Sequence, residues 1–344
     1  MLSRRDFIRG ANGIALTIPF LGLIGCDDTS ADGAHSISGK TMGTTYNVKV
    51  ARASDAVDGE GLASRIQASL DRVESLMSTY RPTSELSLFN ADVAGSSRSV
   101  TTDTARVIET ALAVADMTDG AFDPTVGPLV DLWGFGPNGG RADLPADAEI
   151  TTAMADMGYH NISIANQELA KTTQARLDLS GIAKGFGVDK VAELLEAEGI
   201  EHYLVEVGGE VRTRGLSPED RAWRLGIEKP NPASRDIQRI VGLSGQALAS
   251  SGNYRIFFEA DRQRYAHIID PRSGRPLTHD LASATVIAKT TMQADALSTA
   301  MLVMGTGSAM AFARDHDIAA FLISGRDGSF TDAASPAFER LFSA

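Results

Sequence analysis

The single cysteine is the feature that most constrains how this chain can be held together. Cys26 is the only cysteine among 344 residues, so a disulfide, a zinc site built on thiolates and a cysteine nucleophile are all excluded for the mature domain. The folded part must therefore be stabilised by burial of its own apolar side chains. With 43% hydrophobic residues, the chain is long enough for one large core or two fused smaller ones.

The N-terminus has the layout of a bacterial export signal. Arg4 and Arg5 come before an apolar run at about 14–24, which is shorter than the roughly 20 residues that a membrane-spanning helix needs. The arginine pair resembles a twin-arginine signal, with general secretion as the alternative, and LIGC at 23–26 resembles a lipobox, whose cysteine becomes lipidated. An ordinary signal peptide is the remaining interpretation, and it would leave Cys26 as a free thiol.

These signals predict three regions along the chain. We expect a signal peptide at 1–25, a lipidated Cys26 with a flexible tether at 26–38, and one domain at 39–344, anchored by its lipid on the periplasmic side of the inner membrane. Residues 1–25 hold three arginines and one aspartate, so their removal lowers the formal charge from −12 to −14. Such an acidic protein lacks the basic surface that nucleic-acid binding needs.

Strand and helix signals are interspersed over the whole domain. Apolar spacing predicts helices at 61–77, 104–117, 187–198 and 294–304, and strands at 44–51, 161–164, 176–179, 203–207, 223–227, 237–243, 265–269 and 282–287. The segment 121–140 holds three prolines and many glycines, so it cannot be regular throughout, and loops of this length are usually functional. We therefore expect one compact domain of the α+β or mixed α/β class.

The stretch DLSGIAKGFGVDK, at 178–190, looks like a nucleotide-binding loop but matches neither the GxxxxGK[ST] nor the GxGxxG pattern. A strand ending at Leu179 and a helix starting near Gly187 would still leave backbone amides pointing at a ligand between them. Asp178 could accept hydrogen bonds and Lys184 could donate to a phosphate. The alternative is a tight turn with a surface lysine.

Two further segments carry candidate chemistry. Asp295, Ser298 and Thr299 are spaced i, i+3 and i+4, so a helix would place three oxygen-bearing side chains on one face, which suits Mg²⁺. The alternative is a first helical turn in which Asp295 favours the helix dipole and the hydroxyls bond locally. His267, on the strand predicted at 265–269, could act as a base, although a lone histidine on a strand is more often structural.

Together, these and other segments resemble the ApbE family of FAD:protein FMN transferases. The resemblance covers nearly the whole domain. Each fragment is weak alone, but their occurrence in this order is specific. The fragments are TMGTTYNV at 41–48, MSTYRPTSELSLFN at 77–90, DGAFDPTVGPLVDLWGFG at 119–136, DLSGIAKGFGVD at 178–189, VGGEVRTRG at 207–215, WRLGIEKP at 223–230, ASSGNYR at 249–255, HIIDPRSGRP at 267–276 and ADALSTA at 294–300.

The resemblance implies both a fold and an activity. The fold would be one α+β domain with a mixed, largely antiparallel sheet and flanking helices. The enzyme would bind FAD and Mg²⁺, cleave the pyrophosphate, attach FMN through a phosphoester bond to a threonine or serine of an acceptor protein, and release AMP. The acceptor would be a membrane redox subunit or another exported flavoprotein. Family flavin contacts match Met42, Tyr80, Ala121, Phe122, Asp123, Asp178, Lys184 and Ile269.

The resemblance also implies a metal site and catalytic roles. Asp295, Thr299 and the carbonyl of Gly181 would bind the metal, with Ser298 close by. Lys184 and the metal-binding Asp295 would act on the phosphates, and His267 would accept the proton of the acceptor hydroxyl. Ser250 stands where the family often has threonine, which keeps the hydroxyl.

Three other functions remain compatible with these motifs. Water could attack in place of a protein hydroxyl, which would make the protein an FAD pyrophosphatase that releases FMN and AMP. The chain could also be a non-enzymatic lipoprotein that binds or stores flavin, although flavin binding alone needs no metal site. A general solute-binding lipoprotein is the third alternative, and it would leave the ordered motifs unexplained.

Overall fold

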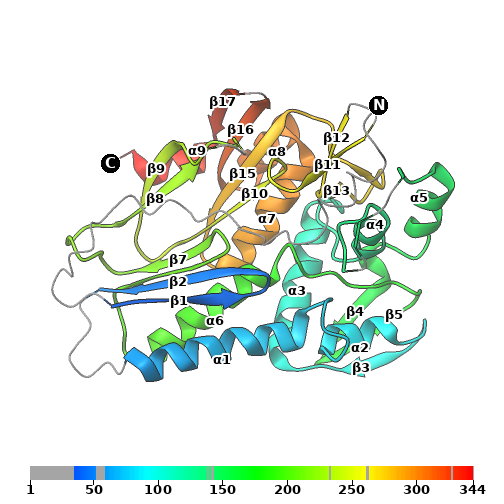
Figure 1. The fold of residues 1–344 in the computed structure, drawn as a ribbon, viewed down its shortest axis with the longest axis horizontal. Coiled ribbons are helices and arrows are strands. Elements are labelled where there is room, and N and C mark those ends of the chain that lie inside the picture. Colours follow the sequence, from blue (N-terminus) through cyan, green and yellow to red (C-terminus); the bar gives the residue numbers. More distant parts are fainter. Residues whose placement is uncertain are drawn as a thin grey trace, which may run out of the picture.

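An eight-stranded antiparallel sheet forms the centre of the fold (Figure 1). The computed structural model describes residues 35–51, 59–137, 139–140, 143–231, 234–260, 263–326 and 328–343, so the predicted signal peptide and Cys26 lie outside the described residues. The strands, in spatial order, are β1 (His35–Thr41), β2 (Thr44–Val50), β6 (Tyr203–Val207), β7 (Glu210–Arg214), β10 (Ala247–Gly252), β15 (Leu281–Ala288), β16 (Ala319–Arg326) and β17 (Ser329–Ala334).

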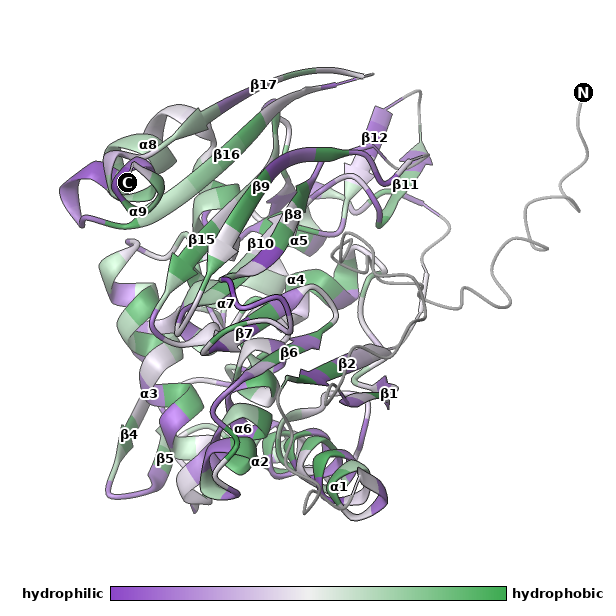
Figure 2. Cartoon of the chain, turned by 90° about the vertical axis from the view of Figure 1, so that its left-hand side faces the viewer, coloured by the Kyte–Doolittle hydropathy of each residue, from purple (hydrophilic) through white to green (hydrophobic). Residues whose placement is uncertain are grey.

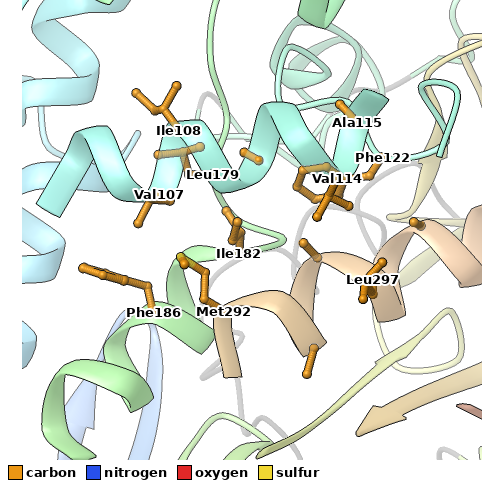
Figure 3. Close-up of a cluster of buried hydrophobic side chains, with 14 of the residues drawn as sticks. Val107, Ile108, Val114, Ala115, Phe122, Leu179, Ile182, Phe186, Met292 and Leu297 are labelled. Atoms are coloured by element: carbon orange, nitrogen blue, oxygen red, sulfur yellow. The ribbon is translucent and has the colours of Figure 1, made fainter. Parts of the chain in front are cut away.

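Helices cover one face of this sheet. The helices α6 and α7 lie against its middle strands, α1 packs on α6, and α3 packs on α7. Figure 3 shows the apolar layer between α3 and α7. Leu179 and Ile182, in the loop that precedes α6, also point into this layer. The helices are α1 (Gly59–Met77), α2 (Glu85–Ala91), α3 (Thr102–Met117), α4 (Gly127–Leu132), α5 (Asp147–Met154), α6 (Ala183–Ala197), α7 (Thr291–Met304), α8 (Thr306–Asp315) and α9 (Pro336–Phe342).

The opposite face of the sheet is covered by a hairpin and by α9. The strands β8 (Trp223–Glu228) and β9 (Ile237–Leu243) form this hairpin. Because side chains alternate along a strand, Phe321 and Ile323 of β16 face the hairpin side, whereas Ala320 and Leu322 face the helices. Both faces are therefore apolar, and β15 and β16 are mostly green in Figure 2.

Three smaller sheets complete the architecture. They are β3 (Ser97–Ser99) with β5 (Glu168–Lys171) and β4 (Ile162–Ala165), β11 (Phe257–Ala260) with β12 (Gln263–Ala266), and β13 (Ile269–Asp270) with β14 (Arg275–Pro276). Every strand pair within the described ranges is antiparallel. The expected α+β fold with a largely antiparallel sheet and flanking helices is therefore confirmed. None of the helices in the described ranges has the length and hydropathy needed to span a bilayer.

Several predicted boundaries need correction. The predicted strand at 176–179 does not form, because the side chain of Asn90 bonds both the N–H and the C=O of Leu177, at 2.7 and 2.8 Å, in place of a neighbouring strand. The predicted strand at 265–269 is interrupted at His267 and Ile268. The sheet also starts at His35, so the last four residues of the predicted tether at 26–38 belong to β1.

The start of α6 is the correction that matters most for the site. The helix begins at Ala183, four residues before the predicted start at Gly187. Lys184 and Gly185 therefore lie in the first turn of α6 rather than in a loop. The N–H groups of a first turn have no partner within their own helix, so they can bond groups beyond the helix end.

Candidate functional site

The site is built where the N-terminal ends of α6 and α7 meet. A Cβ atom on Gly185 would lie 2.4 Å from the carbonyl oxygen of Thr291, so only glycine allows the two backbones to approach this closely. Each helix then supplies a carboxylate to the other. Asp295 Oδ2 accepts a hydrogen bond from the Gly185 N–H at 3.0 Å, and the two oxygens of Asp189 accept from Thr291 N and Met292 N, both at 2.9 Å.

A buried cluster of three charged side chains lies beside this junction. Lys184 comes from α6, Asp295 from α7 and Glu210 from the start of β7. Lys184 Nζ lies 3.1 Å from Glu210 Oε1 and 3.7 Å from Asp295 Oδ1. Asp295 and Glu210 are only 2% and 3% exposed. Their negative charges therefore depend on the nearby ammonium group of Lys184 for compensation.

Burial governs the titration of this cluster. Desolvation raises the pKa of Glu210, although the charge of its ion-pair partner Lys184 opposes the shift. Desolvation also raises the pKa of Asp295, again against Lys184. For Lys184, burial acts to lower the pKa, but the charges of Asp295 and Glu210 outweigh it and raise the pKa. Lys184 is therefore a permanent cation at neutral pH.

Three hydroxyl groups lie together about one helical turn after Asp295. Ser251 Oγ lies 2.9 Å from Ser298 Oγ and 3.0 Å from Thr299 Oγ1, and Ser298 Oγ donates to the carbonyl of Asp295 at 2.9 Å. A Cβ atom on Gly181 would lie 3.3 Å from Thr299 Oγ1, so the Gly181 backbone lies directly beside this hydroxyl. The donors are all oxygen atoms with one carboxylate, a set that fits Mg²⁺ and not a softer metal.

The predicted residues Met42 and Tyr80 lie near the two ends of the 178–190 stretch. Met42 occupies the turn between β1 and β2 with φ +47°, and its side chain packs over Gly187, where a Cβ would lie 2.7 Å from Met42 Cε. Tyr80 is 66% exposed. Partial desolvation and the charges of Asp178 and Asp131 raise the pKa of its hydroxyl, which places the ring near Asp178. An exposed ring there can stack on a planar ligand.

Asp178 itself shapes the loop before α6. Its Oδ1 accepts from the Ser180 N–H at 2.8 Å and from the Ser180 hydroxyl, and its own N–H donates to the Pro124 carbonyl at 2.7 Å. The loop that carries Gly181 is thereby joined to the irregular segment at 121–140. The bond from Asp178 to Pro124 thus takes up a backbone N–H of the segment 176–179, which was predicted to be a strand.

Four predicted flavin contacts are buried and already have partners. Ala121 and Phe122 belong to the interior, and Ile269 packs with Trp133 in a separate apolar cluster. The carboxylate of Asp123 accepts from Thr125 N at 2.8 Å, from Thr125 Oγ1 at 2.6 Å and from Tyr159 N at 3.2 Å. Any ligand contact by 121–123 therefore falls to the backbone rather than to these side chains.

His267 lies in the bend after β12 and is half-buried. Its Nδ1 is 3.2 Å from the Ile256 carbonyl, so the neutral ring donates there from Nδ1 and keeps Nε2 as an acceptor. Phe135 packs edge-on against it, with 6.3 Å between ring centroids. Desolvation by such neighbours, together with the charge of Lys184, lowers the pKa of His267 to about 4.

Three residues of the site were missed by the sequence analysis. Glu210 pairs with Lys184, Ser251 joins the hydroxyls of Ser298 and Thr299, and Asp189 closes the N-terminus of α7. The two carboxylates of Glu206 and Glu210 within the otherwise apolar stretch YLVEVGGEV were the available signal. Nothing in ASSG separates Ser251 from Ser250, which turns to the other face of the sheet and bonds Thr285 at 2.7 Å.

An open hollow of about 590 Å³ lies between α4 and α5, away from this cluster. Apolar and polar side chains line it in similar numbers, and none of the residues at the α6–α7 junction is among them. The lining residues are Pro128, Asp131, Leu132, Ala148, Glu149, Thr152 and Ala153. The chemistry of the site therefore comes from the charged cluster and not from this hollow.

The fold and the site together define an α+β protein with oxygen ligands and a lysine at two joined helix N-termini, an arrangement that suits a phosphate-bearing ligand. The chain matches the ApbE family over residues 42–322. A relative from Vibrio cholerae serotype O1, named FAD:protein FMN transferase, is 41% identical over 96% of this chain and 99% of its own length.

Solved structures agree with this similarity. The flavin transferase ApbE from Vibrio cholerae superposes with a TM-score of 0.83 and 42% identity, covering 89% of this chain and 98% of that one. The apo form of the Pseudomonas stutzeri flavinyl transferase ApbE gives a TM-score of 0.84 and 39% identity, covering 90% and 97%. This chain belongs to the ApbE family, as its motifs indicated.

Proposed function

We propose that this protein is an Mg²⁺-dependent FAD:protein FMN transferase. It acts on FAD as its substrate, attaches the FMN half to a threonine or serine of an acceptor protein and releases AMP. The observation that carries the proposal is the meeting of Lys184, Asp295 and the hydroxyls of Thr299 and Ser251 at one helix junction. The family's transferase name supports the same reaction class.

The chain's own groups supply the binding of the pyrophosphate. The ammonium group of Lys184 and the positive end of α6 attract the negatively charged phosphates, and Gly181 of the preceding loop lies beside the Thr299 hydroxyl. Asp295 and Thr299, with the Gly181 carbonyl, would hold Mg²⁺, which when bound neutralises charge on the phosphates. The side chains thus position the ligand and stabilise charge, the main needs of phosphoryl-type transfer.

The acceptor hydroxyl must lose a proton as the new phosphoester bond forms. His267 is our candidate base, because its Nε2 is left as an acceptor when Nδ1 donates to Ile256. The lowered pKa keeps this ring neutral at neutral pH, which a base requires. The hydroxyl proton passes to His267, the acceptor oxygen bonds the FMN phosphorus, and the pyrophosphate bond breaks to release AMP.

The location of the reaction follows from the N-terminal signals, which lie outside the described residues. We propose export, lipidation at Cys26 and attachment to the periplasmic side of the inner membrane. The acceptor would then be a membrane redox subunit or another exported flavoprotein. The direct check is whether Cys26→Ser releases the protein from membranes of cells that produce it.

The decisive experiment combines the domain, FAD, Mg²⁺ and an acceptor domain that carries a target threonine, and weighs the acceptor by mass spectrometry. We expect a gain of one FMN, lost with EDTA and reduced about a hundredfold or more in Asp295→Asn, which keeps an oxygen for the Gly185 N–H. Free FMN and AMP without a mass gain would instead identify a pyrophosphatase. FAD that stays intact beside an acceptor known to be competent would indicate a flavin-binding lipoprotein.

A further inference from the structure

Glu210 is a buried carboxylate whose only side-chain partner among the described residues is Lys184. Its Oε1 lies 3.1 Å from Lys184 Nζ, while its Oε2 is buried with no hydrogen-bond partner in that part of the chain. The residue is only 3% exposed. A buried carboxylate with one engaged oxygen is costly, so its contact with Lys184 has to account for its presence.

A second buried glutamate of the same hairpin shows the contrast. Glu206, at the other side of the Gly208–Gly209 turn, is also 3% exposed. Both of its oxygens are used, because Oε2 accepts from Asn47 Nδ2 and Oε1 from Gly209 N, each at 2.8 Å. Glu206 therefore stabilises the hairpin through both oxygens, whereas the one side chain of the described ranges that Glu210 contacts by a hydrogen bond or ion pair is Lys184 of α6.

Lys184 has two carboxylates within reach and lies nearer to one of them. Its Nζ is 3.1 Å from Glu210 and 3.7 Å from Asp295, so the ammonium group is held mainly on the Glu210 side. Asp295 Oδ2 is already bonded to the Gly185 N–H, which leaves Oδ1 as its oxygen for a further ligand. Any closer approach of Lys184 to Oδ1 would block that oxygen and add positive charge beside it.

We propose that Glu210 is a positioning residue that draws Lys184 away from Asp295 and so keeps Asp295 Oδ1 available to a divalent cation. The inference rests on the proposed function, since it concerns the cation that this function requires. Glu210 acts through Lys184 and touches neither the cation nor the substrate. Its negative charge also compensates the charge of a cation and an ammonium group held close together in a buried site.

The proposal predicts a metal-binding defect without a change in any metal ligand. In Glu210→Gln the side chain keeps its shape, but the ammonium group loses its carboxylate and pairs with Asp295 instead. We expect the dissociation constant for Mn²⁺, used as a spectroscopic substitute for Mg²⁺ and measured by electron paramagnetic resonance of the free ion, to rise about tenfold or more. The matched control Glu206→Gln should stay within about twofold of the unmutated protein.

A double substitution separates positioning from general damage to the site. Adding Lys184→Met to Glu210→Gln removes the competitor for Asp295, so the double variant should bind Mn²⁺ more tightly than Glu210→Gln alone. A role confined to packing or stability would leave the double variant no better than the single one. If Glu210→Gln does not fold, as judged by circular dichroism, the comparison is made with Glu210→Asp, whose shorter side chain should weaken Mn²⁺ binding to an intermediate degree.

Two results would overturn the proposal in distinguishable ways. If the unmutated protein binds Mn²⁺ and Glu210→Gln binds it equally well, Glu210 does not position Lys184, and the proposed function is unaffected. If the unmutated protein binds no Mn²⁺ at all, the metal site of the proposed function fails, and this inference fails with it.

Discussion

Asp189 and Asp295 each close the N-terminus of the helix that carries the other. Asp189, on α6, accepts from the first two N–H groups of α7, and Asp295, on α7, accepts from an N–H in the first turn of α6. Unpaired N–H groups at a helix N-terminus attract negative charge, so this exchange holds two positive ends side by side. The site for a phosphate-bearing ligand depends on this mutual arrangement.

Removing the Asp189 carboxylate should therefore destabilise the whole domain. Asp189→Ala leaves two buried N–H groups of α7 without acceptors. It also removes the ion pair between Asp189 and Arg212, whose nitrogen and oxygen lie 2.9 Å apart. We expect the free energy of unfolding in urea to fall by about 3 kcal/mol. The control Asp71→Asn changes a carboxylate that bonds Gln67 on the exposed side of α1, where a change within about 0.5 kcal/mol is expected. Equal losses in the two variants would contradict the helix-closing role.

A methyl group at Gly185 should disrupt the same junction. In Gly185→Ala the new Cβ would lie 2.4 Å from the Thr291 carbonyl oxygen, so α6 and α7 must move apart, at a cost of about 2 kcal/mol or more. Gly307 in α8 has no atom within 4 Å of its Cβ position, and Gly307→Ala should leave the stability unchanged or raise it by up to about 1 kcal/mol. Thermal unfolding of both variants tests this, and a Gly185→Ala protein as stable as its control would show that the contact is not restrictive.

The hydroxyl of Ser251 should matter more than that of its neighbour. Ser251→Ala removes the group that joins Ser298 and Thr299 on the face towards α7, and we expect the Mg²⁺ concentration for half-maximal transfer to rise about tenfold. Ser250→Ala removes a hydroxyl on the opposite face, where it bonds Thr285, and should leave the Mg²⁺ dependence unchanged. The same response in both variants would mean that Ser251 does not support the metal site.

The pH dependence of His267 follows from the direction of its pKa. Burial and Lys184 favour the neutral ring, so its proton resonance in NMR should titrate near pH 4 rather than near 6.5. Since a base must be neutral, the rate limited by His267 should hold through pH 6 and fall only as the pH drops towards 4. Because the pKa of His267 is lower in the folded protein than in the unfolded chain, the neutral ring contributes stability above pH 6.5. This contribution is lost as the pH falls from 6.5 towards 4.

Replacement of the histidine tests its role as the base. His267→Ala should abolish the acidic limb that belongs to His267 and lower the rate by about a hundredfold or more. A pH–rate profile that coincides with that of the unmutated protein would exclude His267 as the base. An NMR titration near pH 6.5 would instead contradict the buried environment described for the ring.

Local patterns predicted much of the fold because several elements are amphipathic or strongly apolar. The helices α1 and α3 were located to within two residues at their start, and β6 and β9 match their predicted bounds. The strand predicted at 176–179 was wrong because Asn90, distant in sequence, supplies the hydrogen bonds that a neighbouring strand would make. A pattern within the segment itself carries no trace of such a partner.

The sequence by itself determined that one thiol-free domain of mixed strands and helices must be held by its core, and that the chain carries the ordered motifs of its family. It also placed Asp295, Ser298 and Thr299 on one helix face, since helical spacing is a local property. Only the tertiary structure decided that Glu210 and Ser251 join them. Their side chains come from separate strands of one sheet, and the contact of α6 with α7 at Gly185 depends on packing between elements about a hundred residues apart.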